Sequence, residues 1–301
     1  MTSLHRVILD TDIGSDVDDL MALALILGTP TVDLVGITTV YGDTALRARL
    51  AQRVLTLAGA DAPVHAGIQK PLSGRDVWWA GHEGDLYPEL EKDTYDSDDA
   101  VRFLVDTVTA SPGELDVIAI GPLTNIAAAI TADPAFASSV RHLWVMGGDF
   151  AAGEAEHNFV SDVDAATIVF DAGIPTTITG LEITRQLQIA RDDLDRIAAA
   201  GDLGATIRAE IEQWWAFWNT EWNVPHDPIT VLTLTEPHLF TLSSPGHVKI
   251  GSGDTLGVST LNLERGATRV VTGIDIDGTR TQLVDGIIEG STRTAVAGSA
   301  G

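Results

Sequence analysis

Short apolar runs, many of them rich in β-branched residues, alternate with longer apolar or amphipathic stretches along most of the chain. Short runs of this kind are typical of buried strands in parallel sheets, and the longer stretches are typical of helices. The predicted strands cover residues 7–9, 32–40, 62–67, 115–120, 142–146 and 176–181. The predicted helices cover residues 20–27, 45–58, 99–110, 165–170 and 211–222, and another apolar helix follows residue 228. This alternation predicts an α/β fold with a mostly parallel central sheet flanked by helices.

The pattern continues without an obvious linker, and 301 residues with 45% hydrophobic content are enough for one large core. We therefore predict a single domain over residues 1–295 and a flexible tail over residues 296–301. Between residues 248 and 288, turn signals separate short runs, which favours a β-rich segment.

The charge of the chain excludes several classes of partner. Its 43 acidic and 18 basic residues give a formal net charge of −25, which repels nucleic-acid polymers and anionic membranes. No apolar stretch is long enough to span a membrane, and the N-terminus does not have the layout of a signal peptide. The chain has no cysteine, so neither disulfides nor thiol chemistry are available. These observations favour a small-molecule partner and a cytoplasmic location.

An acidic loop follows the first predicted strand. Five aspartates fall within ten positions: Asp10, Asp12, Asp16, Asp18 and Asp19. The loop lies at the carboxyl end of a strand, the edge at which open α/β sheets bind ligands. Because carboxylates crowded on one loop repel each other, a hard divalent cation with oxygen ligands would stabilise them. Helix capping would account for one or two of these acids, but not for the cluster.

Two other motifs compete for this segment. An EF-hand requires an acid or amide where Gly14 stands and a glutamate where Met21 stands, so it does not fit. A haloacid-dehalogenase-type phosphatase also begins with an apolar strand and aspartates, but Ser15 is misplaced for its motif. Such a phosphatase also needs a lysine before its last acidic motif, and the three lysines of the chain are poorly placed. The phosphatase remains the alternative enzyme.

The acidic loop resembles the N-terminal signature of the inosine–uridine nucleoside hydrolases, DxDPGxDD. Ile13 stands in place of the proline, and two additional residues precede the paired acids Asp18 and Asp19, which makes Asp16 a rival in the alignment. Further segments resemble motifs of that family in the same order. They are residues 39–43 (the last five positions of TTVxGN, with Asp43 in place of asparagine), 121–127 (GPLTNIA), 156–158 (ExN) and 226–228 (HDP). The resemblance covers nearly the whole chain and implies the Rossmann-like nucleoside hydrolase fold.

The resemblance also implies an activity and a set of site residues. Members of the family cleave the N-glycosidic bond of ribonucleosides with a bound Ca²⁺, giving free base and ribose, and dimers and tetramers are common among them. Asp12 would be a calcium ligand and the general base that takes a proton from water. The other calcium ligands would be Asp19, Asp227 and the backbone carbonyl of Ile120. The ribose would be bound by Asp18, Glu156 and Asn158 beside Asp227, and His226 would face the leaving base as a proton or hydrogen-bond donor.

The remaining candidates have structural alternatives. Asp43 could bind substrate or cap a helix, and His82, in the long loop 70–97, could approach the substrate or pack with neighbouring tryptophans. The aromatic residues between positions 211 and 222, Trp218 among them, could stack on a base or belong to the core. The surrounding acids are expected to favour the charged form of His226. A non-catalytic domain that binds calcium or a nucleoside would keep the acids but would not need His226.

Overall fold

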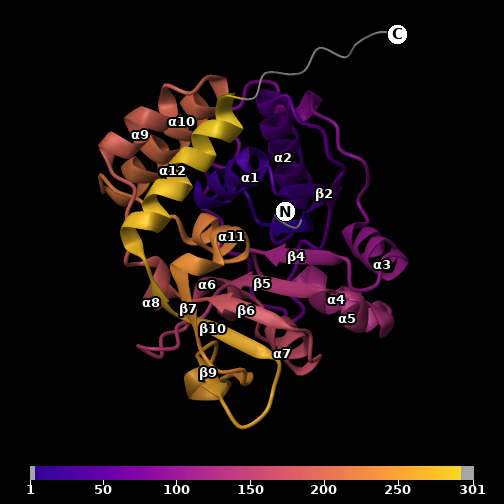
Figure 1. Cartoon of the computed structure of the whole chain (residues 1–301). Coiled ribbons are helices and arrows are strands. Elements are labelled where there is room, and N and C mark those ends of the chain that lie inside the picture. The colour runs from indigo at the N-terminus through magenta and orange to yellow at the C-terminus, as the bar shows by residue number, and fades with distance from the viewer. Residues whose placement is uncertain (1–3, 293–301) are drawn as a thin grey trace.

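The computed structural model describes residues 4–292, which form an eight-stranded sheet with helices on both faces (Figure 1). The strand order is β3-β2-β1-β4-β5-β6-β10-β7, and every neighbouring pair is parallel except β10 and β7. The strands are β1 (His5–Thr11), β2 (Val32–Thr39), β3 (Val64–Ala66), β4 (Leu115–Ala119), β5 (His142–Met146), β6 (Thr176–Thr179), β7 (Phe240–Leu242) and β10 (Thr268–Ile274). A separate antiparallel hairpin consists of β8 (His247–Ile250) and β9 (Ser259–Asn262).

The helices follow the strands in the alternation that the sequence predicts. They are α1 (Asp18–Gly28), α2 (Thr44–Ala58), α3 (Ala100–Ala110), α4 (Thr124–Ala132), α5 (Ala135–Ser139), α6 (His157–Ser161), α7 (Val163–Asp171), α8 (Leu181–Thr184), α9 (Arg191–Ala198), α10 (Asp202–Trp218), α11 (His226–Thr235) and α12 (Ile276–Thr292). Short 3₁₀ turns occur at Leu90–Lys92, Pro237–Leu239 and Gly253–Thr255. Among the helices of residues 4–292, none is both long and apolar enough to cross a membrane.

Two apolar cores lie on the two faces of the sheet. Along β1, the side chains of Val7 and Leu9 enter one core and that of Ile8 enters the other, as the two-residue period of a strand requires. The first core contains residues of α1, α2, α10 and α12, and the second contains residues of α3, α4 and α7. Figure 1 shows these two groups of helices on opposite sides of the strands. Because both faces are covered, the central strands read as continuous apolar runs.

The strand order reverses at β1, which places the acidic loop at a topological switch point. The chain runs outward from β1 to β2 and β3 on one side, and then returns to β4 on the other side. The backbone N–H of Ile120, just after β4, donates to the carbonyl of Asp10 at 2.9 Å. The loops that follow β1 and β4 therefore begin side by side, at the position where sheets of this kind open a binding crevice.

The prediction of a β-rich segment extending to residue 288 is wrong in its last part, because residues 276–292 form α12. Glycine has low helix propensity, and Gly278, Gly286 and Gly290 concealed the helix. Helix α12 lies against α1, and its glycines let the two backbones approach closely. A Cβ atom on Gly290 would lie 2.0 Å from the carbonyl oxygen of Ala24, and one on Gly28 would lie 2.0 Å from that of Gly286. The predicted tail, residues 296–301, lies outside the described residues.

We expect Gly290→Ala to lower the free energy of unfolding by about 1–3 kcal/mol, because the added methyl group must push α1 and α12 apart. In an unconstrained helix the same change would stabilise the protein by about 1 kcal/mol, so the sign of the effect is diagnostic. Urea denaturation would measure it, with Glu289→Ala on the exposed side of α12 as the control. A Gly290→Ala protein that is as stable as the native protein would show that the two helices do not touch at this position.

Candidate active site

A cavity of about 420 Å³ opens at the carboxyl edge of the sheet, around the ends of β1, β4 and β5. It is closed on the other side by residues from α6, α8, α10 and the start of α11. The residues predicted from the sequence that line this cavity are Asp12, Asp18, Asp19, Ile120, Glu156, Asn158, Trp218, His226 and Asp227. Asp43 and His82 are the two predicted residues that are not part of its lining.

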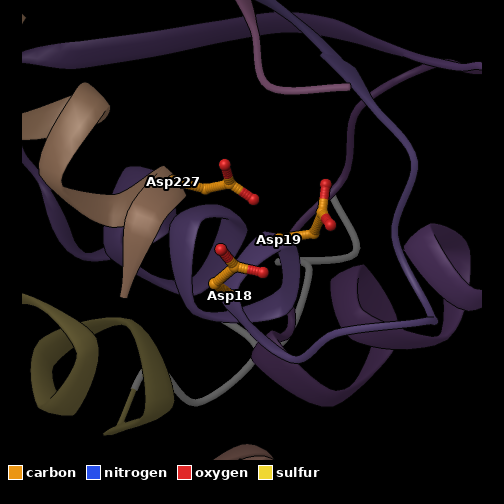
Figure 2. Close-up of side chains that lie close together, drawn as sticks. All are labelled: Asp18, Asp19 and Asp227. Carbon is orange, nitrogen blue, oxygen red and sulfur yellow. The ribbon is translucent and has the colours of Figure 1, made fainter. Parts of the chain in front are cut away.

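Three carboxyl groups converge in the cavity. Asp18 and Asp19 form the first turn of α1, and Asp227 belongs to the first turn of α11 (Figure 2). One carboxylate oxygen from each residue lies within 4.8 Å of the other two. The sequence predicted that Asp18 binds ribose and that Asp12 belongs to the metal ligands, whereas this group contains Asp18 and not Asp12. Asp18 is therefore also positioned as a candidate metal ligand.

The electrostatics of this group fit a bound cation. Burial raises the pKa values of Asp18, Asp19 and Asp227 well above the usual range, and the charges of neighbouring aspartates raise them further. Buried carboxylates that repel each other in this way cannot all remain ionised without a compensating charge. A hard cation such as Ca²⁺ provides that charge and prefers oxygen ligands. The donor set, which consists of oxygen atoms only, therefore suits calcium.

Asp12 lines the same cavity, and its charge contributes to the raised pKa values of Asp18, Asp19 and Asp227. Burial raises the pKa of its carboxyl group, and the positive charges of Arg47 and His157 oppose that rise. A Cβ atom on Gly121 would lie 2.7 Å from Asp12 Oδ1, so glycine is required for the carboxylate to approach the loop after β4 so closely. The carbonyl oxygen of Ile120, in that same loop, accepts a hydrogen bond from Asn158 Nδ2 at 2.8 Å. The Asp12 carboxylate and the Ile120 carbonyl therefore meet at one wall of the cavity.

Asp10 lies below the site and supports the acidic loop. Its Oδ1 accepts hydrogen bonds from Thr38 Oγ1 at 2.6 Å and from Asn125 Nδ2 at 2.7 Å, and burial raises its pKa to about 7. Asn125 belongs to the GPLTNIA segment and also donates to the carbonyl of Thr39 at 3.0 Å. Asn125 therefore connects α4 to the ends of β1 and β2 by hydrogen bonds. At the end of β1, Thr11 Oγ1 also donates a hydrogen bond to the carboxylate of Asp19.

Glu156 and Asn158 line the cavity together, but they have different hydrogen-bonding roles. The carboxylate of Glu156 accepts hydrogen bonds from the backbone N–H groups of Gly148, Asn158 and Phe159, at 3.0, 2.7 and 3.1 Å. It therefore caps the N-terminus of α6, on which Asn158 lies. Asn158 then reaches across the cavity wall to Ile120. Glu156 thus also fixes the position of Asn158.

His226 is buried at the start of α11, and its Nδ1 atom lies 2.7 Å from Thr184 Oγ1. Burial, together with the nearby positive charge of Arg185, lowers the pKa of His226 to about 4. The expectation that the surrounding acids favour the charged form is therefore wrong, because burial and the charge of Arg185 both favour the neutral form. The site presents a neutral imidazole, whose ring is oriented by Thr184.

The remaining candidates are divided between the site and its surroundings. Asp43 is exposed and accepts a hydrogen bond from the backbone N–H of Leu46 at 2.9 Å, so it caps α2. His82 Nε2 lies 2.9 Å from the carbonyl oxygen of Ser15 and its ring packs edge-on against Phe217, so it contacts the acidic loop from outside. Among the aromatic residues of α10, Trp214 and Trp218 line the cavity, whereas Trp215 belongs to the core. Both interpretations of this aromatic group therefore hold, for different residues.

The cavity lining also includes residues that were not assigned from the sequence, among them Tyr41, Arg47, His157 and Arg185. His157 lies between Glu156 and Asn158, and its ring packs edge-on against Trp78 and Tyr41. Arg47 could have been noticed from helical spacing, because it shares a face of α2 with the buried residues Ala51 and Val54. An arginine on the apolar face of a helix points to a specific buried partner.

The comparisons with known proteins agree with this geometry. The family model described as inosine-uridine preferring nucleoside hydrolase matches residues 7–281. The chain is 32% identical to the probable uridine nucleosidase 1 of Oryza sativa subsp. japonica over 278 residues, which are 85% of this chain and 84% of that protein. It is 31% identical to the pyrimidine-specific ribonucleoside hydrolase RihB of Escherichia coli over 219 residues, 69% of each chain.

Solved structures share the fold. The plant nucleoside hydrolase PpNRh1 superposes with a TM-score of 0.84 at 27% identity, covering 94% of this chain and 98% of that one. A purine-preferring ribonucleoside hydrolase from Gardnerella vaginalis gives a TM-score of 0.87 at 24% identity, covering 96% of this chain and 100% of that one. The acidic loop, the motifs that surround it and the sheet on which they lie all have counterparts in one family, which leaves no support for the phosphatase alternative. The chain belongs to the inosine-uridine preferring nucleoside hydrolase family.

Proposed function

We propose that this protein cleaves the N-glycosidic bond of ribonucleosides with a bound calcium ion. The observation that carries the proposal is the convergence of the Asp18, Asp19 and Asp227 carboxyl groups beside Asp12 in one cavity. A bound calcium ion would supply a Lewis acid that acidifies water and a template for the ribose hydroxyls. The ligands available in the chain are these three acids, Asp12 and the Ile120 carbonyl.

Asp12 is the residue that would take the proton from the attacking water. It lines the same cavity as the three converging acids, where its carboxylate would contact both a water molecule and the bound cation. A positioned carboxylate of this kind is an effective general base. The negative charge of the acids would also stabilise the positive charge that develops on the sugar ring as the base departs. Asn158 lies across the cavity, where it can bind a ribose hydroxyl.

His226 would face the leaving base. A neutral imidazole has one N–H group, so it can donate a hydrogen bond to a base that departs with negative charge. Thr184 contacts one ring nitrogen and thereby fixes the orientation of the other. Trp214 and Trp218 line the same cavity and offer flat apolar surfaces on which a base can stack.

We expect His226→Ala to slow uridine hydrolysis by about 10²-fold, the effect of removing one acid–base group. Hydrolysis of p-nitrophenyl riboside should be nearly unchanged, because its leaving group departs without a proton. Both rates are measured by absorbance on the same preparation. An equal loss on both substrates would mean that His226 only positions Asp227, and its role toward the leaving base would have to be abandoned.

The relatives favour uridine as a substrate. Two plant relatives are named as probable uridine nucleosidases, and the bacterial relative is named as a pyrimidine-specific ribonucleoside hydrolase. A panel of nucleosides, with release of the free base followed by absorbance, tests the proposal directly. Base release from uridine that requires calcium would support it. Calcium binding without base release from any nucleoside would instead identify a non-catalytic binding domain.

A further inference from the structure

We propose that Arg47 is a positioning residue for the acidic loop: its buried guanidinium group fixes the backbone of Asp12 and Ile13 and so directs the Asp12 carboxylate into the cavity. The inference rests on the proposed function, because it concerns the loop that would hold the calcium ion. Arg47 belongs to α2, which follows the neighbouring strand β2, so the loop is held from outside its own segment.

The guanidinium group contacts both loops at this edge of the sheet. Its Nε donates to the carbonyl of Tyr41 at 2.6 Å, in the loop after β2. Its Nη1 donates to the carbonyl of Asp12 and to that of Ile13, the latter at 2.8 Å, and its Nη2 donates to Ser15 Oγ at 3.3 Å. All three nitrogens therefore have acceptors, and three of the four acceptors lie between residues 12 and 15.

The burial of Arg47 shows that these contacts are not incidental. Its exposed fraction is 1%, and its hydrogen-bond acceptors among residues 4–292 are three backbone carbonyls and one hydroxyl, with no carboxylate. A fully buried guanidinium group without a carboxylate partner is unfavourable unless its surroundings compensate the charge. Here the compensation comes from the acidic loop itself, because the positive charge of Arg47 attracts both Asp12 and Asp19. Arg47 thus acts on the loop through its hydrogen bonds and through its charge.

The surrounding packing is built to hold this arrangement. The ring of Trp79 lies over the guanidinium group, 4.9 Å from its carbon to the ring centroid. Gly42 has a φ of +79°, and a Cβ atom there would lie 2.6 Å from the Trp79 ring. Gly14, with a φ of +119°, brings the acidic loop so close to α2 that a Cβ atom would lie 2.5 Å from Leu50 Cδ1. The loop therefore rests directly on the helix that carries Arg47, and Trp79 closes the contact from outside.

Lysine would not reproduce these contacts. The planar guanidinium group presents its donors in a fixed fork that reaches acceptors on two separate loops, whereas an ammonium group is a single compact charge on a flexible stem. The proposal therefore predicts graded effects. Arg47→Lys should retain part of the function, because it keeps the charge, and Arg47→Met should lose both the charge and the hydrogen bonds.

The test measures calcium binding and catalysis on the full-length protein. Calcium is removed with a chelator, and its affinity is then determined by titration calorimetry for the native protein, Arg47→Met, Arg47→Lys and Arg49→Met. Arg49 is the matched control, because it lies on the same helix and faces the ring of Tyr95 instead of the acidic loop. We expect Arg47→Met to lower calcium affinity by about 10–100-fold, the usual effect of losing a residue that orients metal ligands. Arg47→Lys should be intermediate, and Arg49→Met should stay within about twofold of the native protein.

Kinetics at saturating calcium separate positioning from folding. The kcat for uridine should fall with Arg47→Met while KM changes little, and circular dichroism confirms that the variant is folded. A folded Arg47→Met protein that matches Arg49→Met in calcium affinity and kcat would overturn the inference. If Arg47→Met does not fold, Arg47→Lys decides in the same way. Should the native protein bind calcium but release no base, the proposed function fails, whereas the calcium affinities still decide the role of Arg47.

Discussion

Replacing Asp12 with asparagine is expected to lower kcat for uridine hydrolysis by about 10³-fold, because an amide cannot accept the proton of the attacking water. Asparagine has nearly the same shape as aspartate, and its side chain would still fit against Gly121, where there is no room for a Cβ atom. The backbone carbonyl that Arg47 holds is also unchanged. The loss should therefore appear in kcat rather than in stability.

The Asp12→Asn experiment needs two controls. Calcium content must be measured beside the rate, since the carboxylate would also contribute to the metal site. Asp43→Asn tests the same change at an exposed acid that caps α2, and it should leave the rate unchanged. Normal turnover by calcium-saturated Asp12→Asn would show that another group removes the proton.

Asp227→Asn should have opposite effects on stability with and without calcium. Without the ion, burial and mutual repulsion oppose the ionisation of Asp18, Asp19 and Asp227, so a neutral amide at position 227 should leave the protein at least as stable as the native protein. With calcium at a hundredfold excess over its Kd, the native protein should gain about 2.7 kcal/mol, and the variant should gain much less. Its hydrolytic activity should also be lost, because the ion no longer binds.

Thermal unfolding in chelator and in calcium measures both effects on the same samples. Glu289→Ala, which changes an exposed acid of α12, controls for a general response to lost negative charge. If Asp227→Asn retains the full calcium stabilisation, the group of three acids is not the calcium site.

The alternation of apolar runs predicted six of the eight strands of the central sheet, β1 to β6, because strands covered on both faces tend to be apolar throughout. It did not predict β7, and it placed β10 only within a β-rich segment. The pattern failed to predict α12, because the glycines that allow close contact with α1 have low helix propensity. Helix propensity is a local property, and the contact that outweighs it here is with residues at the other end of the chain. The ends of α10 also differ from the prediction: the helix covers Asp202–Trp218, whereas the aromatic pattern predicted a helix over residues 211–222.

The part of the site that was predicted from the sequence consists of residues that belong to short motifs. The acids of the loop and the HDP segment meet as expected, since strands and helices place their ends at one edge. Three features depend on the folded environment and leave no motif. The grouping of Asp18 with Asp227 depends on how α1 and α11 pack, the pKa of His226 depends on its burial, and Arg47 reaches the loop from another segment.

The glycine contact between α1 and α12 has a consequence for the synthesis of this protein. Helix α1 is buried along its whole length. Helix α12, which packs against it, is synthesised last among the described elements. A ribosome therefore releases an apolar helix long before its partner exists. Until α12 emerges, α1 must remain exposed, be bound by a chaperone or pack transiently elsewhere. The two acids that open α1 are thus fixed in place only after α12 has been synthesised, which delays the formation of the candidate metal site.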